Sequence, residues 1–130
     1  MTSRFEERAP GFTLVELLVV LAIIATLLSI AVPRYYAHVD RAKEATLRQS
    51  LNVMRESIDK YHADTGKLPD SLEELVTKRY LRKLPLDPIT ESNEGWVIIP
   101  PPNPTLAGNV YDIRSGAPGN ALDGTPYADW

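Results

Sequence analysis

The sequence contains no cysteine among its 130 residues, and this excludes several kinds of chemistry. Without a thiol, the chain cannot form a disulfide, present a cysteine nucleophile or hold a cysteine-based zinc site. There is also no surplus of positive charge, because 14 lysine and arginine residues stand against 17 acidic residues, for a formal net charge of −3. Nothing in this balance favours nucleic acid as a partner. The length suits a single folded domain.

Catalytic motifs are missing as well. There is no glycine-rich phosphate loop, and His38 and His62 do not stand in a metal-binding spacing such as His-Glu-x-x-His. Ser115 and Asp112 would need a histidine close in space to form a nucleophilic site, and no pattern indicates one. We therefore predict that the protein is not an enzyme, that it uses no cofactor, and that both histidines lie at the surface or at a partner contact.

A long apolar run is the most informative feature that is present. Residues 12–32 would form a helix roughly 30 Å long, about the thickness of the hydrocarbon core of a bilayer. A cleaved secretory signal would have a basic start, a shorter apolar core and a small-x-small cleavage site. We therefore predict a retained membrane helix. Its polar residues are Thr13, Glu16, Thr26 and Ser29.

A second, amphipathic helix segment is predicted after Pro33, where a kink or a short break is expected. The apolar side chains recur at spacings of 4, 3, 4 and 3, which predicts one buried face of a helix over about 34–64, ended by Gly66 and Pro69. These side chains are Leu47, Leu51, Met54, Ile58 and Tyr61.

The remainder of the chain predicts a small α+β head. Residues 70–73 (Asp-Ser-Leu-Glu) form a candidate capping box that opens a short helix over 72–76. Residues 96–99 and 110–113 are typical of strands, and residues 115–130 predict an irregular tail rich in Gly, Pro and Asp. The expected fold is one long N-terminal helix, with a membrane half and an amphipathic half, packed on a small antiparallel sheet.

The stretch GFTLVELLVVLAIIATLLSIAVPRY, residues 11–35, resembles the N-terminal signature of the type IV pilin superfamily, called a class III signal peptide. The family pattern is Gly, Phe, Thr-Leu-x-Glu, about twenty apolar residues and a proline near their end. This chain departs from the pattern at Ala9-Pro10, where family leaders usually carry Lys or Arg. The matching residues are Gly11, Phe12, Thr13, Leu14, Glu16 and Pro33.

This resemblance implies an organisation and a location. It divides the chain into a leader peptide (1–11), a transmembrane and assembly helix (12–33) and a periplasmic pilin-like head (34–130). A prepilin peptidase would cleave between Gly11 and Phe12 and N-methylate Phe12. The mature chain would be a single-pass protein of the bacterial inner membrane with its head in the periplasm. The lysines and arginines that flank the apolar run lean weakly toward the opposite orientation.

Glu16 is a carboxylate near the start of the apolar run, where an unpaired charge is unfavourable. A charged side chain at the centre of a bilayer helix costs about 2.5–3.5 kcal/mol, and less near an interface. Cleavage after Gly11 would create a positive amine at Phe12. The resemblance implies that Glu16 meets this amine on a neighbouring subunit of a growing filament. The alternative is that Glu16 reaches the headgroups and has no role in assembly.

Three further stretches, YHADTGKLPDSLEELV, LPLDP and VYDIRSGAPGNALDGTPYADW, resemble the major (G-type) pseudopilins of type II secretion. Many type IV pilins close their C-terminal region with a disulfide, which this chain cannot form. The resemblance implies a structural subunit of a homopolymeric periplasmic pseudopilus that supports protein export. Its partners would be minor pseudopilins, the prepilin peptidase and an inner-membrane assembly platform with a separate ATPase. The alternatives are a type IV pilus subunit or a single-span membrane protein displaying a small periplasmic binding domain.

The same resemblance raises the question of calcium. G-type pseudopilins bind calcium with a C-terminal loop of the form Ser-x-Gly-Ala-Asp-Gly, followed by a later Asp. Here the loop begins at Ser115, and Pro118 stands where the family has its first Asp. Asp123 and Asp129 remain as weak calcium candidates, with Asn120 as a helper, and no metal ligand is assigned. The alternative is a loop held by turns and by Tyr127 and Trp130 packing on the sheet.

Overall fold

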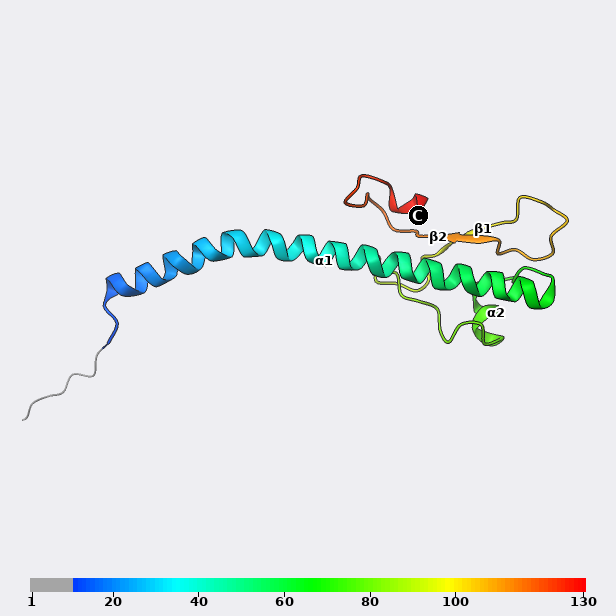
Figure 1. Ribbon diagram of the computed structural model, residues 1–130, viewed down its shortest axis with the longest axis horizontal. Helices are drawn as coiled ribbons and strands as arrows, with labels where there is room; N and C mark the ends of the chain where they lie inside the picture. The colour runs from blue at the N-terminus through cyan, green and yellow to red at the C-terminus, as the bar shows by residue number, and fades with distance from the viewer. Residues whose placement is uncertain (1–10) are drawn as a thin grey trace, which may run out of the picture. The chain divides into compact units, whose positions relative to one another are not determined.

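The computed structural model describes residues 11–130 and confirms an α+β fold (Figure 1). A long helix is followed by a short one, a two-stranded antiparallel sheet and a single 3-10 turn. These elements are α1 (Leu14–Thr65), α2 (Leu72–Thr77), β1 (Val97–Ile99), β2 (Asp112–Arg114) and η1 (Tyr127–Asp129). The residues fall into two compact units that divide between Ala37 and His38. Residues 1–10, which carry most of the expected leader, lie outside the described residues.

The first unit carries the N-terminal part of α1. None of its described residues is buried, and its large apolar side chains are 43–85% exposed, from Val32 to Phe12. Within the described residues, α1 is the one helix long and apolar enough to cross a membrane, with a mean hydropathy of 2.8 in its best window. The break expected at Pro33 is absent, because α1 continues through this residue. Pro33 cannot donate to the carbonyl of Ser29, but regular turns on both sides maintain the helix.

α1 ends where the sequence predicts, next to Gly66. This glycine has a φ of 71°, in the left-handed region that favours glycine, and its N–H donates to the carbonyl of His62 at 2.8 Å. The chain then turns away from the helix axis toward α2.

The helix cap of α2 differs by one residue from the predicted box. Ser71, not Asp70, is the N-cap, and its Oγ accepts from the N–H of Glu74 at 3.3 Å. The side chain of Glu74, not of Glu73, reaches back and accepts from the N–H of Asp70 at 2.8 Å. The sequence offers two overlapping Asp/Ser-x-x-Glu patterns. Of the two glutamates, Glu74 makes the cap, and it also accepts a hydrogen bond from the hydroxyl of Tyr61 on α1 at 2.6 Å.

The sheet forms between the two predicted strand regions, with edges slightly displaced. β1 and β2 are antiparallel, with Ile98 opposite Ile113 in the register. Val110 was expected to begin the second strand, but its N–H donates to the carbonyl of Pro69 at 2.9 Å instead. Val110 is therefore tied to the segment between the helices, and strand pairing starts only after it.

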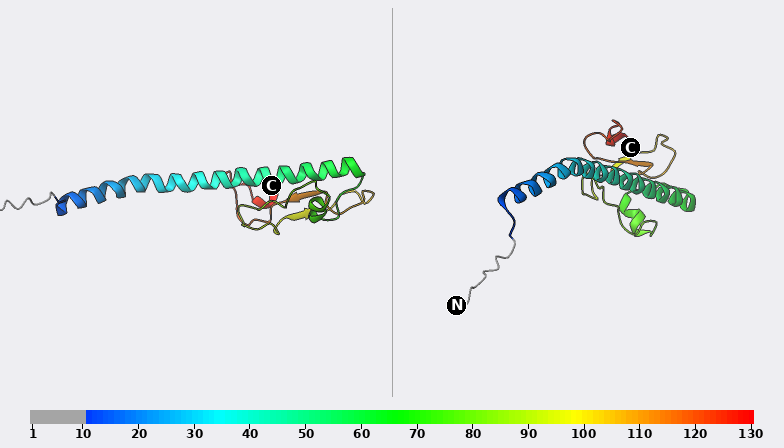
Figure 2. Two further views of the ribbon diagram at one scale, coloured as in Figure 1. Left: turned by 90° about the horizontal axis from the view of Figure 1, so that it is seen from below. Right: turned by 60° about the vertical axis from the view of Figure 1, so that its left-hand side comes forward.

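The core of the second unit lies between α1, α2 and the sheet. Figure 2 shows β1, β2 and the C-terminal segment beside the second half of α1. The predicted stripe on α1 is confirmed, because all five of its side chains are at most 7% exposed. Residues from every other part of the head complete the same cluster, including Leu68, Leu72, Leu75, Leu81, Trp96, Val110, Ile113, Ala117, Ala121 and Tyr127.

Candidate functional site

The N-terminal motif forms a reciprocal cap at the start of α1. The N–H of Glu16 donates to Oγ1 of Thr13 at 3.1 Å, and the N–H of Thr13 donates to Oε2 of Glu16 at 3.4 Å. This is a capping box, in which two otherwise unpaired backbone donors of the first turn are satisfied. This cap was not among the features predicted from the sequence, although the Thr-x-x-Glu spacing at residues 13–16 is a recognised signal for it.

The cap determines where the Glu16 carboxylate stands. It lies in the first turn of α1, where the positive end of the helix dipole favours a negative charge. The bond from Thr13 to Glu16 is long, at 3.4 Å, so the carboxylate retains acceptor capacity for a stronger donor. The structure thus places an acid at the start of an apolar helix, anchored by its own turn and open to a cation.

The bond between Gly11 and Phe12 precedes the helix. Both residues are exposed and have no regular secondary structure. A Cβ added at Gly11 would meet no atom within 4 Å, so nothing inside the protein requires glycine there. Any requirement for glycine at this position therefore has to come from an external partner. Cleavage after Gly11, N-methylation of Phe12 and pairing by Glu16 remain predictions.

The histidines and the Ser115–Asp112 pair show no catalytic arrangement. His38 and His62 are exposed on α1. The hydroxyl of Ser115 donates to Oδ2 of Asp87 at 2.7 Å, while Asp112 accepts from Nε of Arg55 at 2.9 Å. Ser115 and Asp112 therefore engage different partners.

The C-terminal segment does not fit a calcium loop. Oδ1 of Asp123 already accepts from the N–H and the hydroxyl of Thr125, at 3.0 and 2.6 Å. These bonds hold the pKa of Asp123 below its usual value. Ser115, the first residue of the family loop, faces inward to Asp87 and is fully buried. Pro118 contributes no carboxylate, and among residues 11–130 no group of three or more His, Asp or Glu side chains gathers to hold a metal. Calcium prefers 6 to 8 oxygen ligands, carboxylates among them, and the described residues 115–130 gather no cluster of acidic side chains to contribute to such a site.

Comparison with known proteins identifies the family. A family model described as "Prokaryotic N-terminal methylation motif" matches residues 8–32, which contain Gly11, Phe12 and Glu16. The chain belongs to the type IV pilin-like proteins. It is therefore a member of a family of structural subunits, not of enzymes. Its apolar helix and motif are those of a membrane-anchored pilin.

The relatives of this pilin-like protein include secretion and pilus subunits. The type II secretion system core protein G of Pseudomonas aeruginosa is 32% identical over 60% of this chain and 66% of its own length. The core protein G of Escherichia coli K12 is 28% identical over 88% and 86%. The type IV major pilin protein PilA of Myxococcus xanthus is 32% identical over 56% and 33%. The chain spans between about half and two thirds of the first relatives it matches. No solved structure matches.

Proposed function

We propose that this protein is a structural subunit of a periplasmic pseudopilus of a type II secretion system. The observation that carries the proposal is the Thr13–Glu16 capping box at the start of α1, whose N-terminal apolar part is exposed on all sides. Such a helix needs an apolar environment along its whole surface, and first a membrane and then neighbouring copies would supply it. The similarity to core protein G from several bacteria supports secretion as the setting.

Assembly follows from the position of Glu16. Removal of the leader after Gly11 would leave an amine on Phe12, four residues before the acid in the sequence. An ammonium from a neighbouring copy is a better partner for the carboxylate than the distant N–H of Thr13, because a charge-assisted bond is shorter and stronger. Pairing would remove an uncompensated charge from the apolar surroundings, so it favours the filament over the isolated chain.

The proposed setting defines the partners and the location. The protein would be anchored in the inner membrane with residues 34–130 in the periplasm, would polymerise with itself and with minor pseudopilins, and would use a prepilin peptidase and an assembly platform with a separate ATPase. The absence of cysteine makes the orientation simple to test. Lys67→Cys, at an exposed position beyond α1, should react with a membrane-impermeant maleimide once the outer membrane is opened. Reaction only after lysis would contradict a periplasmic head.

Processing is tested by sequencing the N-terminus of the membrane-extracted protein. We expect the wild-type chain to begin at methylated Phe12 and Gly11→Glu to retain its leader. Because Gly11 has open space around it, this substitution leaves the fold intact, and a loss of processing reports on the peptidase alone. A matched control is Thr105→Glu, an exposed position in the head that should be processed normally. An intact leader on the wild-type chain would instead support a single-span protein that displays a binding domain.

The type IV pilus is the second candidate, favoured by the similarity to PilA of Myxococcus xanthus. The two candidate functions are distinguished by deleting the gene and measuring both protein secretion and surface pili. Loss of secreted proteins from the medium with surface pili retained supports the pseudopilus. Loss of surface pili with secretion retained supports the pilus.

A further inference from the structure

The segment 115–130 lies beside α1 and is attached to it through Glu44. Oε1 of Glu44 accepts from the backbone N–H of Leu122 at 2.7 Å and from the hydroxyl of Tyr127 at 3.0 Å. Both donors come from the C-terminal segment, about eighty residues later in the chain. Burial, and then the Glu44 carboxylate, raise the pKa of Tyr127 to about 12, so this hydroxyl remains a donor at neutral pH. A single carboxylate on the helix therefore fixes two points of the segment.

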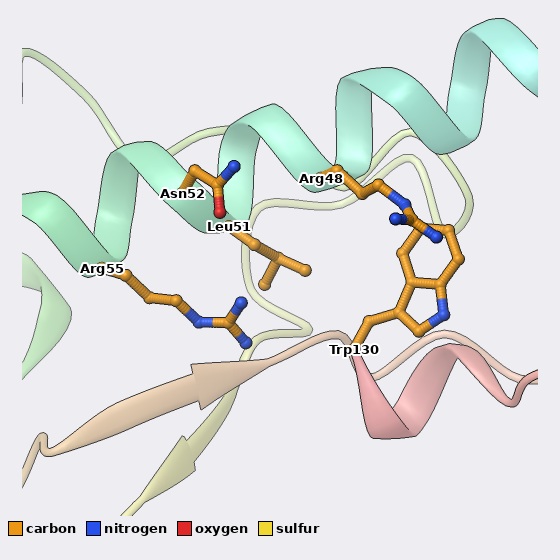
Figure 3. A pocket seen from close by; sticks show the side chains of 5 residues that line it. All are labelled: Arg48, Leu51, Asn52, Arg55 and Trp130. Atoms are coloured by element: carbon orange, nitrogen blue, oxygen red, sulfur yellow. The ribbon is translucent and has the colours of Figure 1, made fainter.

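Arg48, one turn further along α1, makes the second attachment. Its guanidinium lies 4.2 Å from the centroid of the Trp130 ring. Figure 3 shows the two side chains next to each other. The ring is itself fixed, because its Nε1 donates to Oγ1 of Thr125 at 3.0 Å and its edge meets Tyr127 with centroids 5.3 Å apart. The same guanidinium stands 3.9 Å from Oδ2 of Asp123. Arg48 thus places a positive charge beside the carboxylate of Asp123, which was one of the two weak calcium candidates.

The turn that these side chains hold is closed on itself. The N–H of Ala121 donates to the carbonyl of Thr125 at 2.7 Å, and the N–H of Gly124 donates to the carbonyl of Ala121 at 2.9 Å. Gly124 has a φ of 87°, a conformation that a residue with a side chain would adopt only with strain. With Asp123 bonded to Thr125, the turn needs no further ligand to keep its shape. What it needs is attachment to the rest of the head.

We propose that Glu44 and Arg48 form a metal-free clasp that fastens the C-terminal segment to α1 in place of the calcium ion of the related loops. The chemistry matches point for point. A calcium ion would bring positive charge to the acidic side chains of the loop, and Arg48 supplies that charge to Asp123. A calcium ion would also hold the loop through several contacts at once, and Glu44 does so through two hydrogen bonds to one oxygen.

The contacts of the clasp differ in weight. The Arg48–Asp123 pair is long and its side chains are 61% and 54% exposed, so solvent screens it and it contributes least. The Glu44 bonds are charge-assisted, and the one from Tyr127 is part-buried. The stacking of Arg48 on Trp130 uses the strongest aromatic acceptor for a cation. The attachment of the segment to α1 should therefore weaken strongly when Glu44 or the Arg48–Trp130 stack is removed. It should weaken only slightly when salt is added.

The clasp is tested by hydrogen exchange of the full-length protein in detergent micelles, with millimolar calcium or with a chelator. In the wild type, the amides of residues 117–130 should exchange at the same rate in both conditions. Glu44→Gln and Arg48→Met should each speed this exchange about three- to tenfold, since a lost hydrogen bond or stack changes a local opening equilibrium by that order. The amides of residues 47–61 serve as the internal reference for an intact head.

Matched variants separate the clasp from general effects of charge. Glu56→Gln and Arg114→Met remove exposed charges elsewhere on the head and should leave the segment unchanged. Arg48→Lys keeps the charge but loses the planar stack, so it should behave like Arg48→Met. Arg48→Met combined with Trp130→Leu should exchange no faster than Trp130→Leu alone, because that single variant has already lost the stack. Equal exchange in Glu44→Gln, Arg48→Met and the wild type would overturn the clasp. The clasp would also be overturned if calcium slowed the exchange of these amides in the wild type and Asp123→Asn abolished that effect.

Discussion

Ser115 donates its hydroxyl to Oδ2 of Asp87 across 2.7 Å, and both side chains are fully buried. Oδ1 of the same carboxylate accepts from the N–H of Ile89 at 2.8 Å, while Oγ of Ser115 accepts from the N–H of Ala117 at 3.1 Å. This chain of bonds joins the loop before β1 to the segment after β2. The buried carboxylate is a structural element, because the Ser115 hydroxyl and the Ile89 N–H would lose this acceptor without it.

Replacing Asp87 should therefore destabilise the head. Asp87→Ala removes the acceptor of three donors, the buried Ser115 hydroxyl and the part-buried N–H groups of Ile89 and Thr90. A buried donor left without a partner costs about 1–3 kcal/mol. Asp87→Asn keeps one acceptor oxygen and should cost less. The melting temperature of the full-length protein in detergent measures both effects, with the exposed Glu94→Ala as control. Equal melting temperatures for Asp87→Ala and the control would show that the Ser115–Asp87 bond contributes nothing to stability.

Leu51 tests the amphipathic stripe of α1. It is 1% exposed in the centre of the core, so Leu51→Ala should cost about 2–5 kcal/mol through lost burial and a residual cavity. Leu51→Asp should cost more, because its carboxylate would be buried without a partner. Unfolding is followed by tryptophan fluorescence, which includes the signal of Trp96, buried in the same cluster. Gln49→Asp places the same charge on the exposed face of α1 and should leave the unfolding transition unchanged.

The Tyr61–Glu74 bond predicts a pH dependence at both ends of the scale. The 2.6 Å bond raises the pKa of Tyr61 to about 12 and lowers the pKa of Glu74 from 4.5. Because the folded pKa of Glu74 is depressed, its contribution to stability is present above 4.5 and is lost as the pH falls below this value. The folded pKa of Tyr61 is raised. Its contribution to stability is therefore present when the pH is below the ordinary tyrosine pKa of 10.0, and it is lost as the pH rises toward 12.

Tyr61→Phe removes this bond and provides the measurement. The difference in melting temperature between the wild type and Tyr61→Phe should be greatest near neutral pH and should shrink in acid and in alkali. Tyr111→Phe, at an exposed tyrosine, should give no such profile. A constant difference across the pH range would mean that the bond does not couple the two ionisations.

Glu16 has two separable contributions, a helix cap and a charge. Glu16→Gln retains an acceptor oxygen for the N–H of Thr13 but removes the charge, whereas Glu16→Val removes both. We expect both variants to be processed and to remain in the membrane, and both to lose most filament, because pairing with an ammonium needs the carboxylate. The measurement is the amount of filament recovered from cells whose outer membrane has been opened. Normal yield from Glu16→Gln with loss in Glu16→Val would show that the cap, not the charge, supports assembly.

Much of the fold follows from local sequence. The apolar run at residues 12–32, the 4-3-4-3 spacing from Leu47 to Tyr61 and the stop at Gly66 each depend on side chains within a few turns of one another. The absence of cysteine likewise decides by itself that no disulfide closes the head. Helix periodicity and chain termination are properties of short segments, so they can be recognised without knowledge of the remaining chain.

Tertiary structure alone decided the features that join distant segments. The capping box of α2 uses Glu74 and not the predicted Glu73, and Glu74 also bonds Tyr61 on α1. β2 begins after Val110, because the N–H of Val110 bonds the carbonyl of Pro69. Packing of Tyr127 and Trp130 on the sheet was the alternative to a calcium loop, and the structure adds polar and stacking contacts from these residues to Glu44 and Arg48 on α1. Glu44 and Leu122 are 78 residues apart. Each of these side chains has several partners of suitable chemistry in the sequence, and only the packing of the core determines which one comes within bonding distance.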